Sequence, residues 1–158
     1  MQQSAEGNSQ EQSQFSLLRE RRFLPFFCTQ FLGAFNDNVY KNALIIMLAF
    51  YAAGMTSMSS GMLVNLCAGL FILPFFLFSA TAGQLADKYE KSTIIRYVKL
   101  LEIGIMVIGA IGFMHKDLTL LIGALFLMGL HSTIFGPVKY SILPQHLKAD
   151  EIVGGNGM

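Results

Sequence analysis

The strongest constraint on the fold is a set of four apolar stretches, each long enough to cross a lipid bilayer. They cover, in approximate bounds, residues 23–53, 62–86, 94–114 and 118–143. A transmembrane helix needs about 20 predominantly apolar residues. Because backbone polar groups in lipid must be paired within their own segment, such stretches form helices. The sequence therefore predicts an all-α, polytopic membrane protein with four transmembrane helices.

Composition agrees with a membrane protein and argues against a soluble enzyme. Hydrophobic residues make up 53% of the chain and charged residues 13%, whereas soluble domains carry about 25% charged residues. The net charge of +1 and the scattered basic residues give no sign of a nucleic-acid partner. Cys28 and Cys67 lie in apolar stretches without metal-ligand spacing, so we expect small core residues and no cofactor. Their spacing does not decide whether they form a disulfide.

The two ends of the chain are more polar than its body. Residues 1–20 begin with a run rich in Gln, Ser and Glu and are expected to form a disordered cytoplasmic tail. Arginines before the first apolar stretch also suit a secretory signal peptide, but that stretch is too long and no A-x-A site follows it. Residues 148–158 are expected to be a cytoplasmic loop.

Basic residues predict the orientation of the chain, because loops on the cytoplasmic side carry an excess of Lys and Arg. The connection over residues 51–60 has none, and the connection after the third stretch has only Lys116. The other side carries Arg19, Arg21 and Arg22, then Lys88, Lys91, Arg96 and Lys99, then Lys139 and Lys148. This alternation places the N-terminus in the cytoplasm and supports four spans.

Polar residues inside the first stretch are candidates for a substrate or ion path. Asn36, Asp37, Asn38 and Lys41 lie near its centre, where a charged side chain is costly and normally faces a cavity or a partner. Asp37 and Lys41 are four residues apart, so they share a helix face and are able to pair. The alternative is an ion pair that only fixes packing. The two asparagines are expected to hydrogen-bond neighbouring helices.

Two further polar sites lie in the third and fourth stretches. The first turns of the third stretch hold Arg96, Lys99 and Glu102, which must lie near the interface or face protein. We interpret Glu102 as a structural partner of a nearby basic residue. His131 in the fourth stretch is a candidate for proton relay, although hydrogen bonding between helices explains it as well.

The connection between the second and third stretches reads GQLADKYEKSTII. Gly83 would let helices approach closely, and Asp87 could pair with Lys88, Lys91 or another basic group. Taken alone, these residues also fit a simple charged cytoplasmic turn.

The same connection resembles the loop motif of the major facilitator superfamily, G-x-L-A-D-R-x-G-R-K. Five residues match in kind from Gly83 to Lys88, and Lys91 matches in addition, whereas Glu90 stands where the family has Gly and Ser92 where it has a basic residue. The resemblance implies that these four spans are part of the N-terminal six-helix half of that fold. It also implies that Asp87, with Gly83 as a packing contact, stabilises one state of the alternating-access cycle.

Three segments together resemble the lysophospholipid transporter branch of that superfamily: FLGAFNDNVYKNAL, GQLADKYEKS and GPVKYSILPQHL. This branch occurs alone or as the N-terminal part of a fused acyl-glycerophosphoethanolamine acyltransferase. The resemblance implies a bacterial inner-membrane flippase that moves lysophospholipid to the inner leaflet for reacylation. It makes Asp37 and Lys139 candidates for head-group or gating contacts, although Lys139 also fits a lysine that snorkels to the interface.

Length limits this interpretation. A complete transporter of the superfamily has twelve spans in two halves, so we expect a fragment that needs the missing C-terminal half, and an acyltransferase as a possible partner. The HxxxxD motif of glycerolipid acyltransferases is absent from the chain, so we expect no enzyme here. Two alternatives remain: a fragment of a drug or metabolite antiporter, and a small membrane scaffold that binds an acyltransferase.

Overall fold

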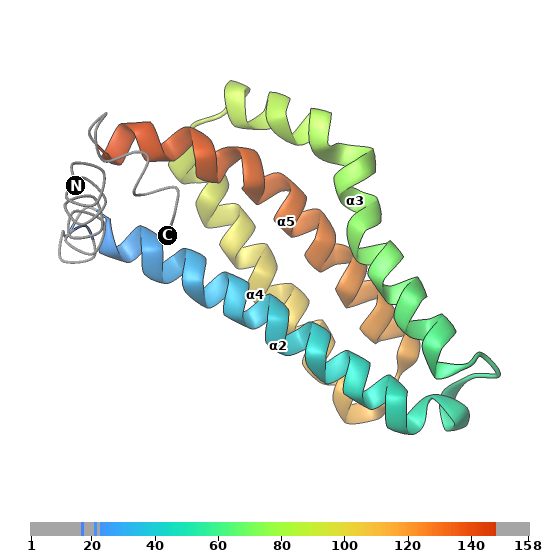
Figure 1. Cartoon of the computed structure of the whole chain (residues 1–158). Helices are drawn as coiled ribbons and strands as arrows, with labels where there is room; N and C mark the ends of the chain where they lie inside the picture. The colour runs from blue at the N-terminus through green and yellow to red at the C-terminus, as the bar shows by residue number, and fades with distance from the viewer. Residues whose placement is uncertain (1–16, 18–20, 22, 148–158) are drawn as a thin grey trace, which may run out of the picture. The chain divides into compact units, whose positions relative to one another are not determined.

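The structure consists of four long helices that follow one another along the chain (Figure 1). This computed structural model describes residues 17, 21 and 23–147, without the side chains of 52, 53, 55 and 143–146. The helices are α2 (Leu24–Met55), α3 (Ser60–Lys88), α4 (Lys91–His115) and α5 (Leu118–His146). No strand occurs in this part of the chain. The all-α class is confirmed, and each helix lies within about three residues of a predicted span.

The chain forms two compact units. The larger unit is Asn36–Val138, and the smaller one combines Met1–Phe35 with Lys139–Met158, so α2 and α5 each contribute to both. The predicted tail over residues 1–20 and the predicted loop over 148–158 lie outside the described residues, except for Leu17. Within the smaller unit, Leu17 is buried in a cluster with Phe23 and Leu147.

All four helices contribute to the core of the larger unit. Its centre holds Leu48, Leu121 and Ala124, whose side chains are fully buried. Around them lie Tyr40, Leu44, Leu63, Cys67, Ile105, Leu125 and Met128. Tyr40 donates a hydrogen bond of 2.8 Å to the carbonyl oxygen of Leu121, so its buried hydroxyl group has a partner. Cys67 is a core residue as predicted, but Cys28 is exposed, and both are free thiols.

Short connections with well-formed caps separate the helices. The side chain of Ser59 caps α3 by accepting from the backbone of Met62, at 3.3 Å. At the end of α4, Lys116 takes a left-handed conformation with φ 52°, and Asp117 bonds back to the carbonyl oxygen of Gly112. The carboxylate of Asp117 then accepts from the backbone N–H groups of Thr119 and Leu120, which starts α5.

The backbones of helices α3 and α5 approach each other closely at Gly129. A Cβ atom built there would collide with the carbonyl oxygen of Phe71 and lie 3.2 Å from the ring of Pro74, which is inside α3. Small residues allow this kind of close approach between membrane helices. Gly129 was not singled out from the sequence, whereas Gly83, which was, has no atom within 4 Å of such a Cβ in the described chain.

We expect Gly129→Ala to destabilise the protein by about 1–3 kcal/mol, because the added methyl group overpacks a contact that involves backbone. The measurement is the thermal unfolding midpoint of the full-length protein in detergent. Gly123→Ala is the matched control, since Gly123 is on the same helix with no atom within 4 Å of its Cβ position. Equal midpoints for the two variants would contradict the contact.

The outer surfaces of the helices are strongly apolar. Phe50, Phe76 and Met114 expose 79%, 84% and 81% of their surfaces, far more apolar surface than a soluble domain presents in continuous patches. Two helical segments, Ser60–Lys88 and Leu118–Ile142, are long and apolar enough to cross a membrane among the described residues. Helices α2 and α4 are as long but carry the charged residues discussed below. The fold is that of a polytopic helical membrane protein.

Candidate functional site

A cluster of polar side chains joins α2, α4 and α5 inside the larger unit. It contains Asn36, Asp37, Lys99, Glu102, His131 and Ser132. The helical repeat of 3.6 residues places Lys99 and Glu102 on one face of α4. Asn36 and Asp37 are adjacent on α2, and His131 and Ser132 are adjacent on α5. We call this set the polar cluster.

Glu102 is the centre of the polar cluster. Its Oε2 atom lies 2.7 Å from the Lys99 ammonium, and its Oε1 atom accepts a hydrogen bond of 3.4 Å from the amide of Asn36. The side chains of Lys99 and Glu102 are only 23% and 12% exposed. The ammonium of Lys99 also lies 4.8 Å above the ring of Phe135. The predicted pairing of Glu102 with a nearby base and the predicted role of Asn36 in bonding another helix are both observed.

His131 faces the same carboxylate from α5. Its Nε2 atom lies 3.5 Å from Glu102 Oε2, yet neither ring nitrogen has a hydrogen-bond partner in the described chain. The ring is 4% exposed and stacks on Phe135 with an interplanar angle of 15°. A contact at 3.5 Å without hydrogen-bond geometry is an electrostatic one, so His131 adds a proton-binding group beside Glu102.

Asp37 contacts α5 through Ser132, the residue that follows His131. The hydroxyl of Ser132 donates to Asp37 Oδ2 at 3.2 Å, while Oδ1 is buried without a partner among the described residues. A half-satisfied carboxylate at membrane depth is unfavourable for stability alone. Thr133, next to Ser132, instead donates to the backbone oxygen of Gly129 on its own helix. Asp37 is therefore the member of the polar cluster with acceptor capacity left for a ligand.

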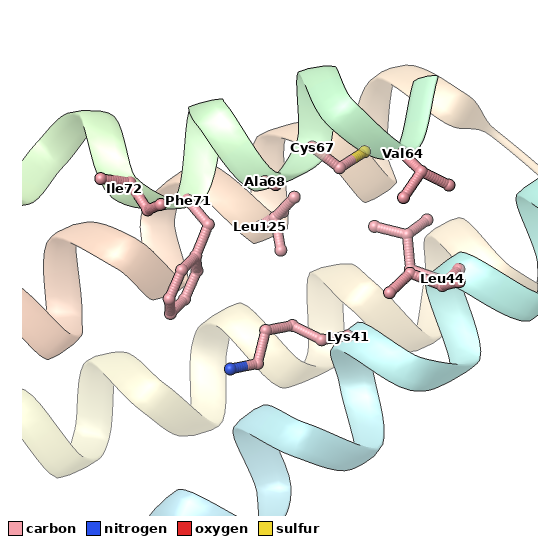
Figure 2. A pocket seen from close by; sticks show the side chains of 9 residues that line it. Lys41, Leu44, Val64, Cys67, Ala68, Phe71, Ile72 and Leu125 are labelled. Atoms are coloured by element: carbon pink, nitrogen blue, oxygen red, sulfur yellow. The ribbon is translucent and has the colours of Figure 1, made fainter. Parts of the chain in front are cut away.

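Lys41 does not pair with Asp37, contrary to the pairing considered from their spacing. No ion pair within 4.0 Å joins these two residues in the described chain. The ammonium of Lys41 lies instead 4.6 Å above the ring of Phe71 on α3. This cation–π contact (Figure 2) replaces the ion pair.

The Lys41 side chain reaches into a pocket between α2, α3 and α5, which we call the Lys41 pocket. Figure 2 shows Lys41 pointing toward Phe71 across this space. The pocket has a volume of about 200 Å³. Its lining residues are Lys41, Leu44, Ile45, Val64, Cys67, Ala68, Phe71, Ile72 and Leu125. Among the described lining residues, Lys41 is thus the only charged one, and the others are apolar.

Lys139 belongs to the smaller unit and lines a different cavity there. This cavity has a volume of about 190 Å³. Its other lining residues are Phe23, Phe26, Phe27, Gln30, Phe31 and Ala34. The Lys139 ammonium lies 5.6 Å from the ring centre of Tyr140, so within this unit its surroundings are aromatic.

The motif segment forms a two-residue turn between α3 and α4. Asp87 and Lys88 are exposed at the end of α3, and no hydrogen bond or ion pair of Asp87 occurs in the described chain. Lys88 lies over the ring of Tyr89, and Lys91 begins α4. The predicted roles of Gly83 and Asp87 in conformational change stay predictions.

Glu90, which departs from the family motif, has a local structural role. It is the N-cap of α4 and accepts bonds from the backbone and hydroxyl groups of Ser92 and Thr93. The hydroxyl donors of Ser92 and Thr93 lower the pKa of the exposed Glu90 carboxyl to about 2. Glu90 and Ser92 therefore replace the family's residues by a cap, which explains both departures together.

Sequence reasoning undervalued Glu102, Lys99 and Ser132. Glu102 was interpreted as a local partner, but it connects three helices. The available signal was the combination of a carboxylate and a lysine in the third span with a histidine in the fourth, because buried charges must find partners. Lys99 was counted among the cytoplasmic charges, whereas the structure places it in the polar cluster.

The described helices have an apolar exterior and charged groups between them, as in polytopic membrane proteins. Comparison with known proteins agrees. Over 89% of its length the chain is 30% identical to the lysophospholipid transporter LplT of Klebsiella pneumoniae, covering 32% of that protein. The transporters of the same name from Cronobacter sakazakii and Salmonella paratyphi B are 27% and 29% identical, over 93% and 85% of this chain.

The chain spans about a third of the length of the curated relatives it matches. No family model matches it, and no solved structure matches it significantly. The predicted resemblance to the lysophospholipid transporter branch is confirmed by these relatives, which are named as transporters.

Proposed function

We propose that this chain is part of a lysophospholipid flippase of the major facilitator superfamily. It would move lysophospholipid from the outer to the inner leaflet of the bacterial inner membrane, where an acyltransferase restores the second acyl chain. The observation that carries the proposal is the similarity over about nine-tenths of the chain to proteins named lysophospholipid transporters.

The polar cluster and the Lys41 pocket support a transport role. Charged groups in spanning helices are costly, and they persist where they contact substrates or ions. The acceptor oxygen of Asp37 suits the ammonium of an ethanolamine head group, and a lysine ammonium suits its phosphate. The proposed flippase thus has donors and acceptors for a zwitterionic head group on helices with apolar outer faces.

The basic residues support an N-terminus in the cytoplasm. Lys99 no longer counts toward this argument because it pairs with Glu102 inside the helices. The turn between α3 and α4 still carries Lys88, Lys91 and nearby Arg96, whereas the turn between α4 and α5 carries only Lys116. The predicted cytoplasmic side therefore still has more basic residues than the other side when Lys99 is left out of the count.

The test is a flipping assay with the full-length protein in liposomes. We expect lysophosphatidylethanolamine that carries a fluorophore on its acyl chain to cross leaflets faster than in protein-free liposomes, while diacyl phosphatidylethanolamine does not. Quenching of outer-leaflet fluorescence with dithionite measures the rate. Transport of drugs or small metabolites without lysophospholipid flipping would support the antiporter alternative, and no transport at all would support the scaffold.

A further inference from the structure

The Lys41 ammonium is a cation without an anion. No carboxylate lies within 4.0 Å of it among the described residues, and its contact is the face of Phe71. A cation–π contact stabilises an ammonium by less than the cost of holding it at membrane depth. Lys99, another lysine inside these spans, has Glu102 for this purpose. Lys41 therefore has its charge available for an anionic ligand.

The apolar lining of the Lys41 pocket indicates which other chemical group the ligand carries. Apart from Lys41, every lining side chain is apolar, from Leu44 and Ile45 on α2 to Ile72 on α3. An acyl chain gains no hydrophobic free energy on leaving the bilayer for such a wall, because lipid tails are equally apolar. The wall accepts an acyl chain without penalty, and the ammonium group provides the selectivity.

Asp37 carries the complementary charge on the same helix. It precedes Lys41 by four residues on α2, so the two positions lie one helical turn apart, about 5–6 Å along the axis. Asp37 is not among the described lining residues of the pocket, and its Oδ1 atom is buried without a hydrogen-bond partner in the described chain. A zwitterionic head group with an ammonium and a phosphate presents the matching pair.

We propose that the Lys41 pocket is the acyl-chain subsite of a single-chain zwitterionic phospholipid, with Lys41 bound to its phosphate and Asp37 to its ammonium. This inference rests on the proposed flippase function and deepens it. It assigns the phosphate to Lys41, whereas the family resemblance pointed to Lys139. In Figure 2 the Lys41 side chain extends toward the Phe71 ring, and this contact orients its ammonium group.

The test compares variants of the full-length protein in the flipping assay, with KM measured for lysophosphatidylethanolamine. Lys41→Gln is expected to raise KM about tenfold, and Lys41→Arg to retain most of the affinity, because a charged hydrogen bond to phosphate is lost in the first and kept in the second. Ala68→Phe keeps the charge but fills the pocket. It should raise KM more for long-chain than for short-chain lysophospholipid, and Ala68 is exposed, so the fold should tolerate the change.

Lys116→Gln is the matched control. The Lys116 ammonium also lies 4.6 Å above an aromatic ring, that of Tyr51, but it is outside the pocket. Its loss should leave KM unchanged.

The outcomes separate this inference from the proposed function. If the wild-type protein flips lysophospholipid while Lys41→Gln and Ala68→Phe leave KM unchanged, the subsite is wrong and the function stands. If the wild-type protein does not flip lysophospholipid, the proposed function fails and the subsite fails with it.

Discussion

Glu102→Ala is expected to lower the free energy of unfolding by about 3–5 kcal/mol, because it leaves the Lys99 ammonium without its anion inside the helices. It also removes the acceptor of the Asn36 amide on α2 and the charge that faces His131 on α5. Three helices would lose a polar contact through one substitution. Thermal and denaturant unfolding of the full-length protein in detergent measures the loss.

The contribution of the Lys99–Glu102 ion pair to stability can be distinguished from the contribution of each residue alone. The double variant Lys99→Met with Glu102→Leu removes both charges, so it should recover most of the stability that Glu102→Ala loses. Arg96→Gln is the control on the same helix, since Arg96 is exposed and its replacement should change stability by less than about 0.5 kcal/mol. If Glu102→Ala unfolds at the wild-type midpoint, Glu102 does not hold the polar cluster together.

Spans and same-helix neighbours followed from sequence because both depend on local spacing. Apolar stretches fixed the helices to within a few residues, and the interval of three between Lys99 and Glu102 predicted their pairing. The approach of His131 to Glu102 joins residues on different helices. Spacing along one helix does not determine which faces of two helices meet, so this contact could not be predicted.

Gly83 and Gly129 show that close packing between two helices also cannot be predicted from spacing along one of them. Gly83 drew attention through its motif, yet the described chain leaves its Cβ position open, and the close helix contact is at Gly129. In sequence both are single glycines inside apolar helices. Only the positions of Phe71 and Pro74 on α3 distinguish them. Similarly, the spacing of Asp37 and Lys41 would allow an ion pair, but the ammonium of Lys41 lies over the ring of Phe71 on another helix.

Asp37→Asn is expected to reduce flipping roughly 100-fold while leaving the protein folded, because the isosteric amide keeps the Ser132 hydrogen bond and removes only the charge. A buried carboxylate with one unpartnered oxygen does not favour folding, so the unfolding midpoint should stay the same or rise. This is the opposite of Glu102→Ala, which should lower stability first. The measurements are the initial flipping rate of lysophosphatidylethanolamine and the unfolding midpoint of the same preparation.

Asp117→Asn is the matched control for this prediction. It makes the same chemical change at the turn before α5, where the side chain accepts from the backbone N–H groups of Thr119 and Leu120. Asn caps a helix about as well as Asp does, so both flipping and stability should be unchanged. Wild-type flipping by Asp37→Asn would show that the carboxylate is not needed for substrate binding. A large loss of stability in Asp37→Asn would make Asp37 a structural member of the polar cluster, equivalent to Glu102.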